Sequence, residues 1–239
     1  MSMSPNDMPS GPGIFLKRRR DWFCRIISSL PVKPALGDIA AVQNALLDLI
    51  DAAGGLELSR GELFRIMAIS QEEYSSLNNE EVASGIRMWG GATVPAVYYA
   101  FFETAIWTRT VIDRFQEPLK LVIQPKDDAL WKSLQKIRSE SGGQVFDDAR
   151  TLAGTSLHWY LPPYAGCGAK VVNGKLIYPV VDTVDDKHDF RSNLKFDKGR
   201  DAEMLVEEYW EAVCLFIDKV LDEFYPNNSR TEDDANQRL

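Results

Sequence analysis

The sequence predicts a mainly α-helical bundle of about six to eight helices with one inserted β-hairpin near residues 169–181. Three observations support this prediction. Apolar residues recur at the three-and-four spacing of helices through most of the chain. Glycines and prolines interrupt these segments. Only the stretch "AKVVNGKLIYPVV" indicates paired strands, because Asn173-Gly174 suits a type I′ turn between two β-prone runs.

The N-terminal part is expected to form several short helices. Residues 14–30 place Trp22 and Ile26 on an apolar face, and their basic run, Lys17–Arg20, is either a solvated turn or a contact with phosphate or an acidic partner. A helix beginning after Asp38 is expected to stop at Gly54-Gly55.

A further helix is expected to begin at Ser59, where Glu62 completes a capping-box pattern. The segment that follows Pro95 is apolar nearly all round, which predicts a central helix buried on most sides. Pro118 and Pro125 are expected to bracket a short connector.

The C-terminal part contains three more predicted helices. The first begins at Asp127 or Asp128 and is interrupted by the sequence "SGG" at residues 141–143. The second covers residues 146–160. The third covers residues 200–224 and has the clearest apolar face of the chain. We expect residues 14–226 to form a single helical domain, between a disordered leader at 1–13 and a disordered tail at 227–239.

The composition is that of an ordinary soluble globular protein, with 45% hydrophobic and 26% charged residues. The net charge of −8 disfavours broad, salt-driven binding to nucleic acid but leaves a local basic cleft open. The three scattered cysteines predict neither a disulfide framework nor a zinc site. The most apolar stretch, residues 91–107, is short for a membrane span and contains Glu103, so we expect no membrane segment and a cytoplasmic location.

One of the two histidines, His158, follows Arg150 on the helix predicted over residues 146–160. The eight positions between them correspond to about 80° around the helix axis and about 12 Å along it. An arginine can hold a phosphate, and a histidine can move a proton near neutral pH, so together they suit metal-free cleavage of a phosphodiester. The alternative is a structural histidine at a helix end.

This pattern resembles the HEPN superfamily, in which many helical proteins are toxin, abortive-infection or defence ribonucleases. The resemblance covers roughly residues 90–225 and rests on "ARTLAGTSLH" and "DAEMLVEEYWEAVCLFIDKVLDEF". Family ribonucleases carry four to six residues between the Arg and the His, whereas seven separate Arg150 from His158 here. The resemblance implies a homodimer that cleaves RNA without a cofactor or metal, with Arg150, His158 and a buried acidic residue, Glu103, at the catalytic site.

Two alternatives remain open from the residues. The first is a non-enzymatic helical binding or regulatory module that forms homo- or hetero-oligomers, for example with an antitoxin-like protein partner. The second is a carboxylate-bound metal site in "DTVDDKHD", where His188 lies among Asp182, Asp185, Asp186 and Asp189. A solvated acidic loop is the simpler interpretation of this second pattern.

Overall fold

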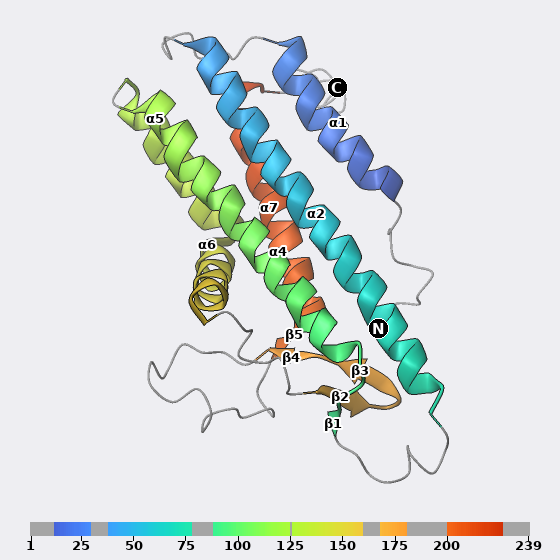
Figure 1. Ribbon diagram of the computed structural model, residues 1–239. Helices are drawn as coiled ribbons and strands as arrows, with labels where there is room; N and C mark the ends of the chain where they lie inside the picture. The colour runs from blue at the N-terminus through green and yellow to red at the C-terminus, as the bar shows by residue number, and fades with distance from the viewer. Residues whose placement is uncertain are drawn as a thin grey trace, which may run out of the picture.

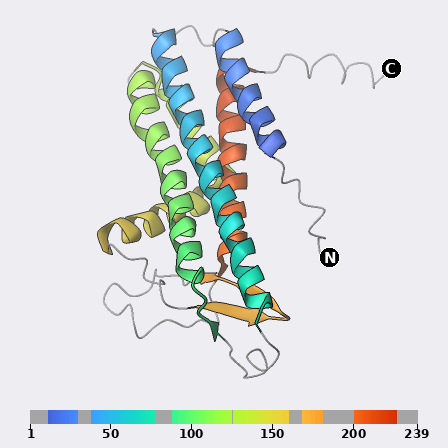
Figure 2. The same ribbon diagram turned by 45° about the vertical axis from the view of Figure 1, so that its right-hand side comes forward.

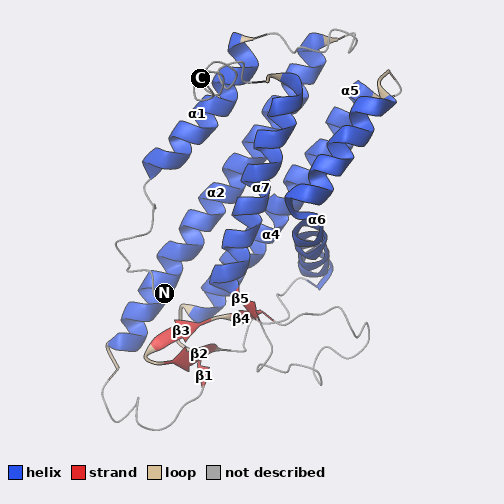
Figure 3. Cartoon of the chain, turned by 180° about the vertical axis from the view of Figure 1, so that it is seen from behind, coloured by secondary structure: helices blue, strands red, loops and turns tan. Residues whose placement is uncertain are grey.

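A computed structural model describes residues 12–29, 38–77, 88–124, 126–159, 168–180 and 200–226. Long helices lie side by side and alternate in direction, and short strands gather at one end of them (Figures 1 and 3). Residues 1–11 of the predicted leader, the predicted tail, and the acidic loop at 182–189 lie outside the described residues. The predicted leader is too long by two residues, because Pro12 and Gly13 already belong to the first helix. The helical elements are α1 (Pro12–Ser28), α2 (Ile39–Ser75), α4 (Val94–Arg114), the π-helical turn η2 (Phe115–Leu119), α5 (Lys120–Ile123), α6 (Asp128–Trp159) and α7 (Ala202–Phe224).

The mainly helical class is confirmed, but the predicted number of helices is wrong. The described ranges contain five helices rather than six to eight, with α4, η2 and α5 forming one continuous run. The expected break at Gly54-Gly55 does not occur, because α2 continues through both glycines and through Ser59.

The glycine at position 55 has a packing role rather than a stop role. A Cβ built on Gly55 would lie 2.6 Å from Cζ3 of Trp107 on α4, closer than real side chains approach. The missing side chain therefore lets α2 and α4 approach each other closely. The sequence pattern that predicts a helix end also occurs where two helices cross, and here the tertiary contact decides between them.

Pro118 likewise lies inside helical structure and not in the expected connector. A proline has no N–H to donate and its ring crowds the preceding turn, so an ordinary α-turn is strained at that point. The wider π-turn of η2 accommodates the proline, and the chain remains helical to Ile123. Pro95 occupies the first turn of α4, as predicted.

The predicted interruption of α6 is present as a kink. Gly142 has φ 156° and ψ 42°, which are not helical values. A Cβ at this glycine would lie 2.7 Å from the Cβ of Ala212 on α7, so the kink also permits a close approach between two helices. Beyond it, the second half of α6 crosses the bundle at an angle to the other helices (Figure 2).

The predicted hairpin is confirmed. β2 (Ala169–Val172) pairs antiparallel with β3 (Lys175–Ile177), and Asn173 and Gly174 both have positive φ, as a type I′ turn requires. Two short pairings were not predicted. β1 (Met88–Trp89) pairs with β2, and β4 (Pro179–Val180) pairs with β5 (Arg200–Asp201). Strands of two residues carry too little pattern to be detected in the sequence.

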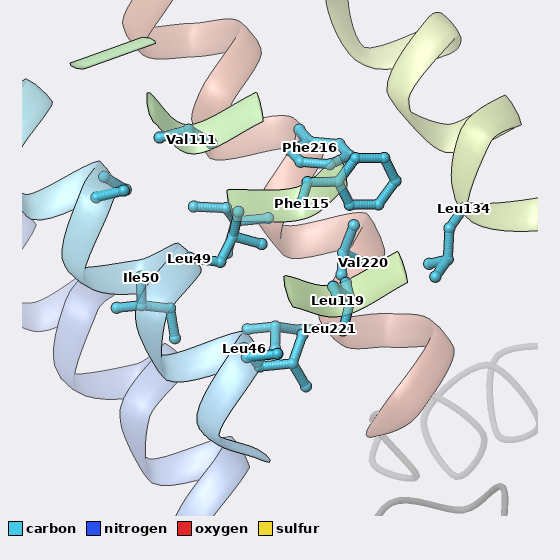
Figure 4. Close-up of a cluster of buried hydrophobic side chains, with 14 of the residues drawn as sticks. Leu46, Leu49, Ile50, Val111, Phe115, Leu119, Leu134, Phe216, Val220 and Leu221 are labelled. Carbon is cyan, nitrogen blue, oxygen red and sulfur yellow. The ribbon is translucent and has the colours of Figure 1, made fainter. Parts of the chain in front are cut away.

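The buried side chains form two hydrophobic clusters along the bundle. One lies towards the end that carries α1 and α5, where Phe115 packs edge-on against Phe216 with ring centroids 4.9 Å apart (Figure 4). The other lies towards the strands and includes Phe101, Tyr98 and Tyr178. Long helices such as α2, α4 and α7 contribute residues to both clusters, so the two ends of the bundle share their framework.

Two arginines of the basic run, Arg18 and Arg19, bind acidic residues of the chain itself. Arg18 pairs with Asp218 of α7 at 3.1 Å, and Arg19 pairs with Asp51 of α2 at 2.5 Å. Further along α1, Arg25 pairs with Asp222 at 2.6 Å. These pairs hold α1 against α2 and α7 beside the buried side chains of Trp22 and Ile26, so Arg18 and Arg19 have acidic partners within the chain.

By length and composition, α2 is the one helix of the described ranges that could cross a membrane. About half of its most apolar window, 56%, is buried inside the bundle. A core helix passes the same test, and burial of this extent is typical of one.

Candidate functional site

Arg150 lies on the outward face of the second half of α6. Phe146, Ala149 and Ala153 are fully buried on the opposite face of this segment. Their spacing is that of one helix stripe facing the core, which leaves Arg150 exposed to solvent. The prediction of a helix here is confirmed, since α6 continues to Trp159.

Arg150 also lacks a carboxylate partner among the described residues. The nearest acidic residues in sequence are engaged elsewhere: Asp147 binds Arg138 at 2.6 Å, and Asp148 accepts a hydrogen bond from Gln144 at 2.7 Å. Asp148 also lies 3.9 Å from Arg200. Most other arginines of the described ranges form ion pairs, so an exposed, unpaired guanidinium on α6 is available to an anionic ligand.

His158 lies in the last turn of α6, where its backbone is helical. The side chains of residues 155–159 lie outside the described part of the structure, as does the second histidine. The convergence of Arg150 and His158 on one ligand therefore stays a prediction.

Glu103 was expected to be buried, and this expectation is wrong. Its neighbours Phe102 and Thr104 are buried, but Glu103 falls on the outward face of α4 and is exposed. Hydrophobic residues of α4 meet α2, α6 and α7 on its other sides, so the apolar composition of the helix does not imply burial at every position. Arg109, further along the same helix, binds Asp113 at 3.2 Å.

Metal ligands do not gather elsewhere in the described ranges, where no group of three or more His, Cys, Asp or Glu side chains is placed to hold an ion. The carboxylates around His188 lie outside those ranges.

A hollow that was not predicted lies where α2 meets the hairpin. It has a volume of about 430 Å³ and its wall comes from three elements. The residues that line it are Phe64, Met67, Ala68 and Gln71 of α2, Asn173, Gly174, Lys175, Leu176 and Tyr178 of the hairpin region, and Glu203 of α7. A volume of this size falls in the range of small-molecule sites, roughly 300–1,000 Å³.

Gln71, one of the lining residues, connects α2 to the hairpin. Its side-chain oxygen accepts a hydrogen bond from Leu176 N at 2.9 Å, and its nitrogen donates to Gly174 O at 3.1 Å. The amide thus bonds to the turn and to the strand β3 that follows it. The spacing of Phe64, Met67 and Gln71 places them on one helix face, but the sequence does not indicate which element covers that face.

Tyr178 fixes the other side of the hollow. Its backbone carbonyl accepts from Ala202 N at 2.9 Å, and its ring packs edge-on against Tyr98 at 6.2 Å. Burial raises the pKa of the Tyr178 hydroxyl. The hydroxyl of Ser70 opposes this rise in pKa, and the carboxylates of Asp201 and Glu73 add to it. The carboxylates of Asp201 and Glu73 therefore lie close enough to Tyr178 to disfavour a negative charge on its hydroxyl.

A second polar cluster lies nearer the N-terminus of α2, about one turn before the residues that line the hollow. Arg60 binds both carboxylate oxygens of Glu207, with Nη2 at 2.6 Å and 2.9 Å from them, and its guanidinium lies 5.0 Å from the centre of the Phe64 ring. Close to it, burial raises the pKa of Glu57 to about 7, although Arg60 and Arg19 both favour the ionised form. No single residue pattern identifies this cluster, because its members come from three helices.

The chain was compared with protein-family models, curated proteins and solved structures, and none of them matches it.

Proposed function

We propose that the protein is a metal-independent endoribonuclease of HEPN-like build, or a catalytically degenerate relative of one, that acts in a toxin or defence system. The observation that carries the proposal is the exposed Arg150, which has no carboxylate partner among the described residues and lies on a helix that continues to His158. An anion such as an RNA phosphate is the natural ligand of such a group.

The proposed chemistry divides between the two side chains. Arg150 holds the phosphodiester and stabilises the charge that develops on its non-bridging oxygens. His158 accepts the proton of the attacking 2′-hydroxyl or protonates the leaving oxygen. Two copies of the chain facing one another would supply two such pairs to one RNA, which accords with the homodimer that the family resemblance implies.

The test is cleavage of varied RNAs in EDTA by the wild type, Arg150→Ala and His158→Ala. We expect the wild type to cleave and each variant to lose about 10²-fold or more of the rate. Arg114→Ala is the matched control, because Arg114 is exposed on α4 and makes no ion pair in the described ranges. Cleavage that requires a metal, or that survives both substitutions, would contradict the proposal.

A second function, a non-enzymatic binding module, is favoured by the position of Glu103. Glu103 and Tyr99 lie one turn apart on α4 and both are exposed, Tyr99 by 48%. An exposed aromatic side chain is enriched at surfaces that contact a protein partner. If no RNA is cleaved, sedimentation of the wild type and of Tyr99→Ser tests whether this surface forms such a contact. A self-association that weakens in the variant supports the binding module.

A further inference from the structure

The hollow between α2 and the hairpin combines an apolar wall with an open mouth. Phe64 and Met67 are only partly buried, although both pack against the hydrophobic cluster at this end of the bundle. Leu176 and the ring of Tyr178 continue the apolar wall and are buried. A ligand with a small hydrocarbon body could cover the exposed parts of Phe64 and Met67 without any movement of the backbone.

The described lining of the hollow carries one acidic and one basic side chain, and two further carboxylates act on its Tyr178. Glu203 lines it directly, with its side chain 25% exposed. Asp201 accepts a hydrogen bond from the backbone N–H of Tyr178. Glu73 accepts hydrogen bonds from the backbone N–H of Ala92 and from the hydroxyl of Thr93. Among the described residues of the wall, Lys175 is the one cation. A ligand that brings a positive charge is therefore favoured over one that brings a negative charge.

Lys175 already shows how an ammonium group binds here. Its Nζ lies 2.9 Å from Oε2 of Glu203, and its side chain remains 66% exposed. An ion pair this exposed contributes little to stability, because water screens both charges. The ammonium of a ligand could consequently replace that of Lys175 on Glu203, while the ligand's hydrocarbon part enters the hollow.

We propose that this hollow binds a small primary amine with an apolar body, whose ammonium pairs with Glu203 and whose hydrocarbon group packs against Phe64, Met67 and Leu176. The site is separate from the described part of the proposed ribonuclease site, since neither Arg150 nor Glu103 is among the described residues that line it. It gives the chain a means of sensing an organic amine at the junction of its helices and its hairpin.

Three probes that share one hydrocarbon body test the proposal. Phenethylamine, 2-phenylethanol and phenylacetate carry a positive, a neutral and a negative head on the same ring. Each is titrated into the isotope-labelled full chain, and binding is followed by NMR shifts of the residues around the hollow. We expect phenethylamine to bind with a Kd on the order of 1 mM, about threefold to fivefold more tightly than the alcohol. Phenylacetate is expected to bind least.

Two substitutions are expected to change the affinity for phenethylamine in opposite directions. Glu203→Gln removes the acceptor charge and should reduce the affinity to that of the alcohol. Lys175→Met removes the internal competitor and should raise the affinity. Glu211→Gln, at an exposed position on α7, is the matched control and should leave it unchanged.

Lys175→Met also keeps the proposal testable if Glu203→Gln weakens the start of α7, which a thermal melt would reveal. Equal binding of the three probes would show an apolar hollow without selection for charge and would overturn the proposal. Preferred binding of phenylacetate, weaker binding of phenethylamine to Lys175→Met, or no shift around the hollow at high phenethylamine would overturn it as well.

Discussion

Gly55 of α2 lies against the indole ring of Trp107 of α4, so closely that a side chain on the glycine would overlap the ring. The two residues mark the level at which the two helices cross. Gly61, further along the same helix, faces open space, with no atom within 4 Å of a Cβ built there. Alanine substitutions at these two glycines therefore have different effects. At Gly55 the added methyl group meets the Trp107 ring, whereas at Gly61 alanine only favours the helix.

Gly55→Ala should therefore destabilise the protein, and Gly61→Ala should stabilise it. Overpacking typically costs about 1–3 kcal/mol, whereas alanine in an open helix position gains about 0.5–1 kcal/mol over glycine. Urea unfolding followed by circular dichroism measures both changes. Equal stability of the two variants would mean that Trp107 moves aside at no cost.

Arg60→Lys should destabilise the bundle more than Arg65→Lys. Arg60 is largely buried, binds Glu207 with two nitrogens and lies near the Phe64 ring, and a lysine cannot reproduce this planar arrangement. We expect a loss of about 1–2 kcal/mol for Arg60→Lys. Arg65 and Glu62 form a more exposed pair on the same helix, so Arg65→Lys should leave the stability nearly unchanged. Chemical denaturation of both variants measures the two changes in stability. An equal loss in both would show that the replacement of arginine by lysine, and not the position of Arg60, causes the effect.

Glu57→Gln should remove a pH dependence from the stability. The pKa of Glu57 is raised from its ordinary value of 4.5 to about 7, so between these pH values the folded state binds a proton that the unfolded state has released. The contribution is present below pH 4.5 and is lost as the pH rises through 7. We expect a loss of about 1 kcal/mol in the wild type between pH 5 and pH 8, because solvent screens this partly buried group.

Thermal melts of the wild type and Glu57→Gln across that pH range provide the measurement, and the variant should be the more stable protein at pH 8. Glu62→Gln is the control, since its hydrogen bond from Arg65 lowers the pKa of Glu62. This second variant should not gain stability at pH 8. A parallel pH dependence in the wild type and Glu57→Gln would assign the effect to other groups.

Gln71→Leu should loosen the hairpin. The substitution keeps the volume but leaves the N–H of Leu176 without its 2.9 Å partner, which typically costs about 1–3 kcal/mol. Hydrogen exchange over residues 168–180 should become faster, with less change in the remote part of α6. Gln144→Leu, an exposed glutamine bonded to Asp148, should leave the exchange of the hairpin unaltered.

The parts of the fold that depend on local chemistry were predicted from the sequence. The type I′ turn at Asn173-Gly174 requires two residues that tolerate positive φ, and the apolar stripe of α7 requires only helical spacing. The interruption at Gly142 was also predicted correctly. In each of these cases one short segment contains the whole of the physical reason.

The parts that depend on distant residues were not predicted. Gly55 ends no helix because Trp107, far away in sequence, occupies the space beside it. Glu103 is exposed because the neighbouring helices cover other faces of α4, and composition does not report which faces those are. The hollow has the same origin, since its wall is completed only when the hairpin folds back onto α2. Arg150 and His158 were proposed as a site from the chemistry of their side chains alone, and their joint action stays a prediction.

The two hydrogen bonds of Gln71 have a consequence for how the protein behaves at high concentration. β3 lies at the edge of its three-stranded sheet, and an edge strand with a free N–H invites a strand from another molecule to pair with it. Gln71 already occupies the outward N–H of Leu176, so this edge is closed by the chain's own side chain. One glutamine on a helix thus hinders a strand of another molecule from adding at the β3 edge of this sheet, which is how templated aggregation begins.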